Sequence, residues 1–588
     1  MQDLYPSPAR AAEAVGRLSF LENGRDVGLR FSFSPQSLVG LRVKIPRFLG
    51  TSAVHLQLLR DGEEQPAVFP LRLCGGDGRY DVYAVLLDAG TFAADRSLFF
   101  GSLTAESAYG TLHMVREAGA RIRFSLKKEK EACFPLFFCD PRPQHQAAGG
   151  AIYALPIREL SRLGRLFRGE DTDIETFFFH LRTLGVRILW LCPPAGEEQE
   201  EVRWDPSQLP ASFCSSAEKN GILLLFDLIC CSGVRAGGDF VSQAESLPFT
   251  APGEGVDDRP GFWNMPSLPA GESRSIDAYF CGRDGIVSCA RQAGAGGFFV
   301  RMADRFGDAL LQAIKESMPG GVLLGGVNGP PFPILFGVRR RYLFGGSLDG
   351  ISGNALRRAA LSYLVEGETG PLARYLGDYL PALPAHAAAW QANPLSLYGE
   401  GDFLSAVQDA YGQSGGQDGN LPRLLAELGH LLAGTLPGMP MYIAGEENGL
   451  PYPPAPGEAV GGQLAFFLRL AQLRRRETVY RGGGFRLLHL SSELLVYARE
   501  REGEALLTVI NRSPARLSIL SPDGFSVMFG GRGLKTAFAV RPFGGIVIKV
   551  ACWEGETCRL HFTHETEKST EAAGTVTTAL SYRTARVK

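Results

Sequence analysis

The segment IETFFFHLRTLGVRILWLCPP, residues 174–194, contains a helical pattern that is followed directly by a strand pattern. In its first half, apolar residues recur every three or four positions, which places them on one face of a helix. These residues are Ile174, Phe177, Phe178, Leu181 and Leu184. The following run, VRILWLC, is almost wholly apolar, as is typical of a strand buried on both faces. A helix joined to such a strand predicts one unit of a parallel α/β sheet.

Eight short apolar runs, separated by amphipathic segments, lie between residues 146 and 478. They are IYALP (152–156), VRILWLCP (186–193), ILLLFDLI (222–229), GGFFVRM (296–302), GVLLGGV (321–327), LFGGSLDG (343–350), ANPLSL (392–397) and MPMYIAG (439–445). Buried strands that alternate with helices predict a parallel sheet, and eight repeats predict its closure into a (β/α)8 TIM barrel. We therefore expect an α/β fold whose barrel spans residues 146–478.

The sequence on both sides of this barrel shows the period-two alternation of half-buried strands. The stretch VHLQL at residues 54–58 is one example, and residues 1–145 as a whole predict an N-terminal β-sandwich. The alternation returns after the barrel, so residues 479–560 predict a small C-terminal antiparallel β-domain. Residues 561–588 are polar and predict a loosely ordered tail.

Composition and charge exclude several classes of protein. The chain of 588 residues carries 60 basic and 62 acidic side chains, which argues against a nucleic-acid-binding protein. Apolar runs stay well short of the ~20 residues that a membrane-spanning helix needs. The start, MQDLYPSPARAAEAV, lacks the basic and apolar regions of a secretory signal. Eleven cysteines without a CxxC pair fit free thiols in a reducing compartment, so we expect a cytoplasmic protein.

Four segments of the barrel region resemble the α-amylase family of glycoside hydrolases (glycoside hydrolase family 13). Residues 149–164 and 174–194 resemble the first two barrel strands of that family, and residues 338–361 resemble the region of its sixth strand. LPGMPMYIAGEENGL at residues 436–450 resembles the eighth-strand pattern PGxPxIYYGDExGM. The similarity is greatest to neopullulanase and cyclomaltodextrinase types. Those types imply a starch-binding-like N-terminal sandwich, a homodimer formed through it, and α-glucan substrates.

In that family, acidic residues and histidines at the C-terminal ends of barrel strands form the catalytic site. The third-strand motif Asp-x-x-x-Asn-His corresponds to DLICCS at residues 227–232, where Asp227 is kept and Ser232 replaces the histidine. The fourth-strand nucleophile motif corresponds to GFFVRMAD at residues 297–304. By this resemblance Arg301 takes the place of the nucleophilic aspartate.

Two further motifs also lack the catalytic residues of the family. The fifth-strand acid motif corresponds to GGVN at residues 325–328, so Gly326 replaces the general acid. The seventh-strand His-Asp pair corresponds to NPLSLYG at residues 393–399, which puts Tyr398 and Gly399 at those positions. The segment after the second strand is also short and lacks the family's Tyr-Asp element. The resemblance therefore implies no catalytic residue, and we expect no cofactor and no metal.

An arginine at the nucleophile position opposes glycoside cleavage. Arginine is a permanent cation without a lone pair to offer, whereas the transition state of cleavage builds positive charge at the anomeric carbon. A guanidinium about 4 Å away raises the barrier by roughly 4 kcal/mol at an effective dielectric constant of ~20. We therefore expect an α-amylase-family homologue without glycosidase activity. Its expected role is to bind α-glucans or maltooligosaccharides, or to act as a scaffold in carbohydrate metabolism.

Two other functions stay open at this level. The first is an active glycoside hydrolase or transglycosidase that uses relocated carboxylates, for which the candidates are Asp304, Glu400, Asp402 and Glu446. The second is a barrel in which Arg301 binds a sugar phosphate or another anion. Asp227 is either a sugar contact or an ion-pair partner of Arg301. The residues that could bind an α-glucan are Asp227, Arg301, Trp204, Trp263 and Trp390.

Overall fold

The computed structural model divides into two compact units, of which the first comprises Met1–Pro143, Pro331–Gly345 and Ala373–Ala388 and the second comprises the rest. The structure describes residues 17–28, 32–93, 97–117, 121–126, 133–139, 147–156, 171–192, 211–229, 280–283, 285–301, 303, 308–327, 347–383, 385–396, 401–448, 463–501, 504–551, 557–565 and 577–583. In these ranges no helix is long and apolar enough to cross a membrane.

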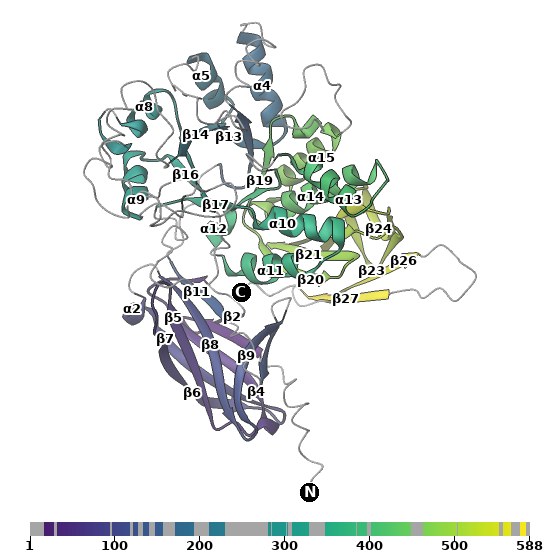
Figure 1. Cartoon of the computed structure of the whole chain (residues 1–588). Helices are drawn as coiled ribbons and strands as arrows, with labels where there is room; N and C mark the ends of the chain where they lie inside the picture. Colours follow the sequence, from purple (N-terminus) through teal and green to yellow (C-terminus); the bar gives the residue numbers. More distant parts are fainter. Residues whose placement is uncertain are drawn as a thin grey trace. The chain divides into compact units, whose positions relative to one another are not determined.

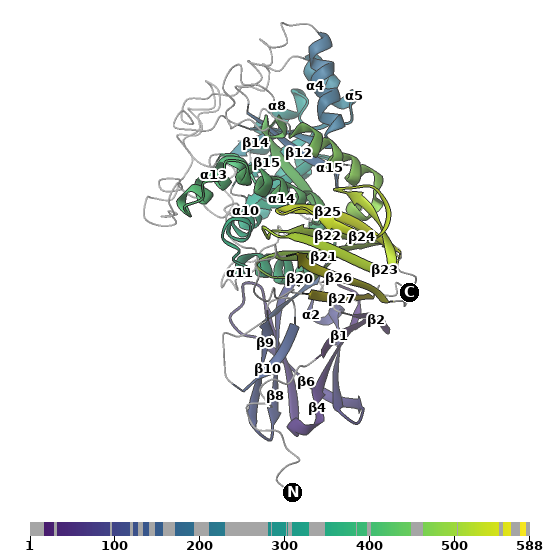
Figure 2. The ribbon, with the colours of Figure 1, turned by 90° about the vertical axis from the view of Figure 1, so that its right-hand side faces the viewer.

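The N-terminal unit is a β-sandwich, as the alternating sequence predicts. The first half of β6 (Ala67–Gly76) pairs with β5 (Ala53–Arg60), and its second half pairs with β7 (Tyr80–Asp88), so β6 passes from one layer to the other. Figure 2 shows the two layers facing each other. Their inward side chains, including Val54, form one apolar core. The other strands are β1 (Arg17–Glu22), β2 (Arg25–Gly28), β3 (Ser32–Phe33), β4 (Leu38–Pro46), β8 (Ser97–Ser107), β9 (Gly110–Glu117), β10 (Arg121–Ser125) and β11 (Phe134–Phe138).

The second unit contains a closed parallel barrel of eight strands, β12 to β19 in chain order (Figure 1). The strands are β12 (Ala151–Pro156), β13 (Val186–Cys192), β14 (Leu223–Ile229), β15 (Gly297–Arg301), β16 (Val322–Val327), β17 (Gly350–Gly353), β18 (Ala392–Pro394) and β19 (Met439–Ile443). The helices between and after them are α4 (Asp171–Thr183), α5 (Ala211–Lys219), α8 (Ile286–Gln292), α9 (Asp308–Ser317), α10 (Ala355–Leu361), α11 (Gly370–Arg374), α12 (Ala385–Ala389), α13 (Phe403–Gln413), α14 (Leu421–Thr435) and α15 (Leu464–Arg476). The TIM barrel predicted from the eight apolar runs is confirmed.

One of the eight strands lies later in the chain than its run predicts. The run at residues 343–350 predicts the sixth strand, but β17 begins only at Gly350, the last residue of that run. The strand sequence is GISG, in which Ile351 is the only large apolar residue. A count of apolar positions cannot find a strand of this composition. Gly350 is required there, because a Cβ at this position would lie 2.2 Å from the carbonyl oxygen of Trp390.

The C-terminal part of the second unit is an antiparallel sheet that packs on α14 and α15. Its strands are β20 (Gly484–Leu490), β21 (Leu494–Arg501), β22 (Glu504–Asn511), β23 (Arg516–Phe529), β24 (Gly533–Val540), β25 (Gly544–Ala551), β26 (Thr557–Glu565) and β27 (Thr577–Arg583). In the described part of residues 561–588 the chain is not loosely ordered as predicted, because β26 and β27 extend this sheet beyond β23. Leu560 and Phe562 alternate with polar residues and are buried, which explains why such a polar segment forms a strand.

Candidate functional site

Three residues that the sequence singles out face the barrel interior near its C-terminal end. Leu225, Phe299 and Leu324 belong to the barrel core. Side chains two positions apart on a strand point to the same face, so Asp227, Arg301 and Gly326 also point inward, nearer the strand ends. This is the end at which TIM barrels build their sites.

Asp227 and Arg301 form an ion pair across neighbouring strands. The Nε atom of Arg301 donates to Oδ1 of Asp227 at 2.9 Å. The Asp227 side chain is 3% exposed and the Arg301 side chain is 22% exposed. The structure therefore shows the ion-pair alternative for Asp227, and the guanidinium is the more accessible half of the pair.

The protein environment makes the Asp227 carboxylate costly to ionise. Burial raises the pKa of Asp227 to about 6, although the charge and hydrogen bond of Arg301 and the indole of Trp190 act in the opposite direction. Burial, with a contribution from the Asp227 charge, also raises the pKa of the Cys192 thiol well above its ordinary value. Without Arg301, the carboxylate would be a buried charge with its main stabilising partner removed.

Below this pair, aromatic rings fill the barrel. The rings of Trp190 and Phe299 stack with their centroids 4.0 Å apart and their planes 21° from parallel. Both residues are buried in the barrel core. Trp190 lies inside an apolar run, which predicts a core residue, so the sequence alone does not mark it as part of the site. These rings form the floor beneath the Asp227–Arg301 pair.

Gly326 offers no group that could donate a proton to a substrate. A Cβ on the neighbouring Gly325 would lie 2.4 Å from Cδ1 of Leu348 and 2.7 Å from Cβ of Ala303, so Gly325 faces the packed outer side of β16. By the alternation of a strand, Gly326 faces the barrel interior. The position that the resemblance assigns to the general acid is therefore a bare stretch of backbone.

Of the four candidates for a relocated carboxylate, Asp402 is engaged at the start of a helix. It is the N-terminal cap of α13, where its side chain accepts hydrogen bonds from the Ser405 amide at 2.8 Å and from the Ser405 hydroxyl at 2.7 Å. The residue is buried. Such a cap stabilises the helix, and the carboxylate is turned toward the backbone that it holds.

Glu446, a second candidate, is buried in the turn after β19 and is 5% exposed. Its carboxylate accepts hydrogen bonds from the Ile443 amide at 3.2 Å and from the Ser396 hydroxyl, and it pairs with Nε2 of His430 at 3.3 Å. Burial alone would raise the pKa of Glu446, but the charge and hydrogen bond of His430 and the other hydrogen bonds outweigh it and lower the pKa. Glu446 thus connects the ends of β18 and β19 to α14.

The adjacent residue, Glu447, is held in the same way on the outer side of the barrel wall. It accepts a hydrogen bond from the Tyr153 hydroxyl at 3.1 Å and pairs with Nε2 of His180 at 3.2 Å. Tyr153 points outward, because its neighbours Ile152 and Ala154 belong to the barrel core. Burial and the charge of Glu447 raise the pKa of Tyr153 well above its ordinary value. This network positions the turn after β19 and points away from the barrel interior.

Of the three tryptophans predicted to bind a sugar, the structure describes Trp390, and it does not lie at the site. Trp390 is 4% exposed and belongs to the barrel core. It immediately precedes β18, so it lies toward the amino end of that strand, opposite the end that holds Arg301. The prediction that Trp390 binds a sugar is not compatible with this place. The other predicted site residues lie outside the described ranges, and they are Trp204, Ser232, Trp263, Asp304, Tyr398, Gly399 and Glu400.

The described ranges contain no group of three or more His, Cys, Asp or Glu side chains placed to hold a metal ion. Within these ranges, the inward-facing groups at the C-terminal end of β14, β15 and β16 are one carboxylate, one guanidinium and one glycine. Such a set can bind a polar or anionic ligand through the guanidinium. It does not supply the pair of carboxyl groups that retaining glycoside cleavage uses.

The comparisons with known proteins identify the fold. No family model matches the chain, and no curated protein matches its sequence. Among solved structures, it is similar to an Anoxybacillus α-amylase with a TM-score of 0.52 and 15% identity, covering 69% of this chain and 99% of that one. A Geobacillus thermoleovorans α-amylase complexed with acarbose matches with a TM-score of 0.51 and 14% identity over 69% of this chain and 99% of that one. A maltogenic amylase from S. marinus matches with a TM-score of 0.50 and 14% identity over 87% and 80% of the two chains. The chain therefore has the α-amylase fold that the sequence resemblance predicts.

Proposed function

We propose that this protein is an α-amylase-fold protein that binds α-glucans or maltooligosaccharides without hydrolysing them. The observation that carries the proposal is the 2.9 Å ion pair between Arg301 and Asp227 at the C-terminal end of the barrel. The proposed role is that of a carbohydrate-binding or scaffold protein in carbohydrate metabolism.

The loss of hydrolysis follows from the charges at the site. Retaining cleavage needs a nucleophilic carboxylate and a carboxylic acid about 5–5.5 Å apart. Arg301 and Gly326 stand where the resemblance places these two groups. A guanidinium has no lone pair with which to attack the anomeric carbon, and the missing acid removes a further ~10²–10⁴-fold in rate. Both effects act against cleavage.

The fold supports the carbohydrate part of the proposal. One structure with the same fold, the α-amylase of Geobacillus thermoleovorans, is complexed with acarbose. A barrel that keeps this fold while its reactive positions change can retain affinity for a related saccharide, since binding and catalysis use different contacts. Fold alone does not carry activity, so binding and turnover need separate measurements.

The direct test measures binding and hydrolysis on the same preparation. Isothermal titration with maltoheptaose and with a cyclodextrin should show binding, while reducing-sugar release from soluble starch and pullulan should stay at the level of buffer. Glucose-free isomaltooligosaccharide mixtures serve as the control, because they test whether binding depends on the type of glycosidic linkage. Binding with turnover contradicts the loss of hydrolysis. The absence of heat with both saccharides contradicts the carbohydrate role and leaves the scaffold role.

A second candidate function rests on the exposure of Arg301. Its side chain is 22% exposed, against 3% for Asp227, and arginine suits phosphate recognition. TIM barrels frequently bind phosphate groups at this end. If the ligand is a sugar phosphate, glucose 1-phosphate binds and glucose does not, and Arg301→Gln abolishes the difference. Equal weak binding of both sugars, insensitive to salt, excludes this candidate.

A further inference from the structure

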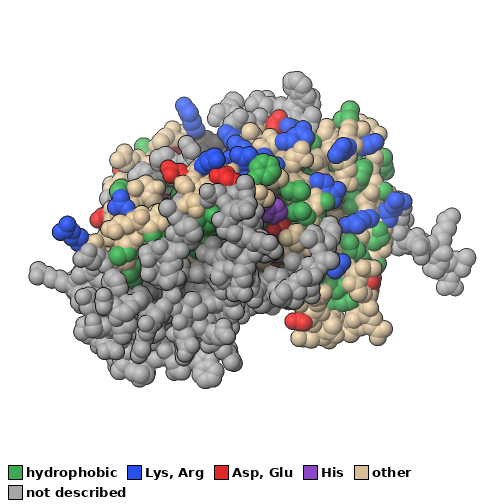
Figure 3. Space-filling model, turned by 90° about the horizontal axis from the view of Figure 1, so that it is seen from above, with side chains coloured by type: hydrophobic (Ala, Val, Ile, Leu, Met, Phe, Trp, Pro, Cys, Tyr) green, Lys and Arg blue, Asp and Glu red, His purple; other side chains and the backbone are tan. Residues whose placement is uncertain are grey.

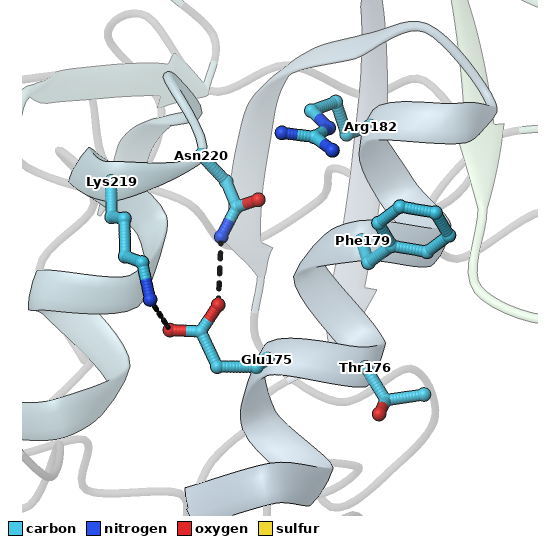
Figure 4. A pocket seen from close by; sticks show the side chains of 6 residues that line it. All are labelled: Glu175, Thr176, Phe179, Arg182, Lys219 and Asn220. Carbon is cyan, nitrogen blue, oxygen red and sulfur yellow. Dashed lines mark hydrogen bonds and ion pairs between the residues drawn. The ribbon is translucent and has the colours of Figure 1, made fainter.

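A shallow groove of about 420 Å³ lies on the helical layer of the barrel, away from the strand ends described above. Glu175, Phe179 and Arg182 follow each other at helical spacing on α4, so they form one stripe along that helix. The opposite wall is the end of α5 (Figure 4). The lining residues are Glu175, Thr176, Phe179, Arg182, Lys219 and Asn220.

The groove is held rigidly between α4 and α5. Phe178 of α4 packs against Phe213 of α5 with ring centroids 5.0 Å apart. Glu175 accepts hydrogen bonds from Ser216 at 2.9 Å, from Lys219 at 3.1 Å and from Asn220 at 3.3 Å. These contacts lower the pKa of Glu175, so its carboxylate is ionised and engaged at neutral pH. The two walls are thus joined before any partner binds.

Phe179 is the exception in an otherwise buried run of phenylalanines. Phe177 and Phe178 are buried in the contact with α5, whereas Phe179 is 57% exposed. The Arg182 guanidinium carbon lies 5.3 Å from the centroid of the Phe179 ring, a cation–π contact that fixes the ring in place. An ordered, exposed aromatic ring beside an arginine has the composition of an interface hot spot.

Other cations lie near the groove. The Arg475 guanidinium donates to the backbone carbonyl of Arg182, one of the lining residues, at 3.4 Å. Arg187 is exposed and its guanidinium lies near Gly221, where an added Cβ would meet it at 3.2 Å. Figure 3 shows Lys and Arg side chains gathered on the described surface of the face seen from above. Basic residues at helix C-termini offset the helix dipole, but that role does not require an exposed phenylalanine among them.

We infer that this groove is a docking site for an acidic segment of a partner protein, which places an apolar side chain on Phe179 and carboxylates beside Arg182 and Arg475. Charge complementarity selects the acidic partner, and the aromatic ring selects a segment that also carries an apolar residue. Glu175 already pairs with Lys219 in the groove, so the partner's carboxylates are placed beside Arg182 and Arg475 instead. This inference uses no residue of the barrel interior and stands apart from the proposed function.

The test uses three fluorescently labelled short peptides and the full-length protein. One peptide contains glutamates around a central pair of leucines, the second has glycines in place of the leucines, and the third has lysines in place of the glutamates. We expect the first peptide to bind with a Kd on the order of 10 μM. The second should bind at least ~10-fold more weakly, and the third should not bind.

Variants of the protein separate the groove from general surface charge. We expect Phe179→Ala and Arg182→Glu each to weaken the binding of the first peptide by ~10-fold or more. Two control variants should bind the first peptide with unchanged affinity. Leu534→Ala removes a side chain that is 77% exposed on β24, and Arg423→Glu reverses an exposed charge on α14. Unchanged thermal unfolding shows that each variant is folded. The inference is overturned if Phe179→Ala binds the first peptide normally, if the lysine peptide binds as tightly as the first, or if the glycine peptide binds as tightly as the first.

Discussion

At the scale of the residue, the main finding is that a permanent cation and a buried carboxylate neutralise each other at the C-terminal end of the barrel. Asp227 is nearly inaccessible and Arg301 is partly exposed. Arginine holds its proton under all ordinary conditions, so the state of the pair depends on Asp227 alone. Stability measurements can therefore test the pair without any knowledge of the ligand.

Removing the arginine should destabilise the fold. Arg301→Ala leaves the buried Asp227 carboxylate without its cation, and breaking a buried pair from one side costs about 3–5 kcal/mol at neutral pH. Chemical denaturation measures this loss in the free energy of unfolding. Arg423→Ala, at an exposed position on α14, is the matched control and should change stability by less than about 0.5 kcal/mol. Equal, small effects of both changes would mean that Asp227 does not depend on Arg301.

The raised pKa of Asp227 gives a pH dependence with a definite sign. Its pKa is about 6 in the folded protein, against an ordinary value of 3.8. Between these values the folded state binds more protons than the unfolded state, so stability falls as pH rises. Stability is highest below about pH 4, and the loss reaches about 3 kcal/mol once pH has risen through 6. The stability of wild type relative to Asp227→Asn should fall over this range, and a rise would contradict the pKa assignment.

At the scale of the element, the turn after β19 is fixed by two adjacent carboxylates that point away from the barrel interior. Glu446 binds α14 and the end of β18, whereas Glu447 binds α4 and β12. The sequence shows only two glutamates in a polar turn, a pattern more typical of solvated loop residues. Their burial depends on His430, Ser396, Tyr153 and His180, which come from four distant parts of the chain. No local pattern can reveal such partners.

Glu446 should therefore contribute to stability and not to turnover. Glu446→Ala leaves His430 and the Ser396 hydroxyl without their shared partner, and we expect a loss of about 3–5 kcal/mol in the free energy of unfolding. Glu218→Ala, at an exposed position on α5, is the control and should have little effect. If Glu446→Gln instead removes a measurable glycosidase activity while unfolding normally, Glu446 is a relocated catalytic carboxylate.

At the scale of the whole molecule, the repeating patterns of the sequence predict the architecture well. Eight buried runs predict the barrel, and alternating residues such as those at positions 54–58 predict the sandwich. The failures occur where a strand lacks apolar residues, as in GISG of β17, or where a strand is mostly polar, as in β26. Hydrogen bonds to neighbouring strands fix both segments, and single-sequence periodicity does not report those bonds.

Some features of the candidate site are likewise predictable from the sequence and others are not. The place of Asp227, Arg301 and Gly326 at one end of the barrel follows from strand register, which the sequence motifs fix. Trp390 was a candidate by residue type alone, and residue type does not show that it lies before β18, toward the amino end of that strand. The floor formed by Trp190 and Phe299 is a three-dimensional contact between β13 and β15. The position of a motif residue along its strand is thus predictable from the sequence, whereas the residues that it contacts across the barrel are not.

The most direct test of the central claim is the rate of reducing-end release from maltoheptaose by the purified full-length protein, measured beside Arg301→Ala. We expect no release above buffer from either protein, because the cation and the missing acid both prevent cleavage. Release by the unmodified protein at about 1 s⁻¹ or faster, the ordinary range of enzymes, would contradict the account.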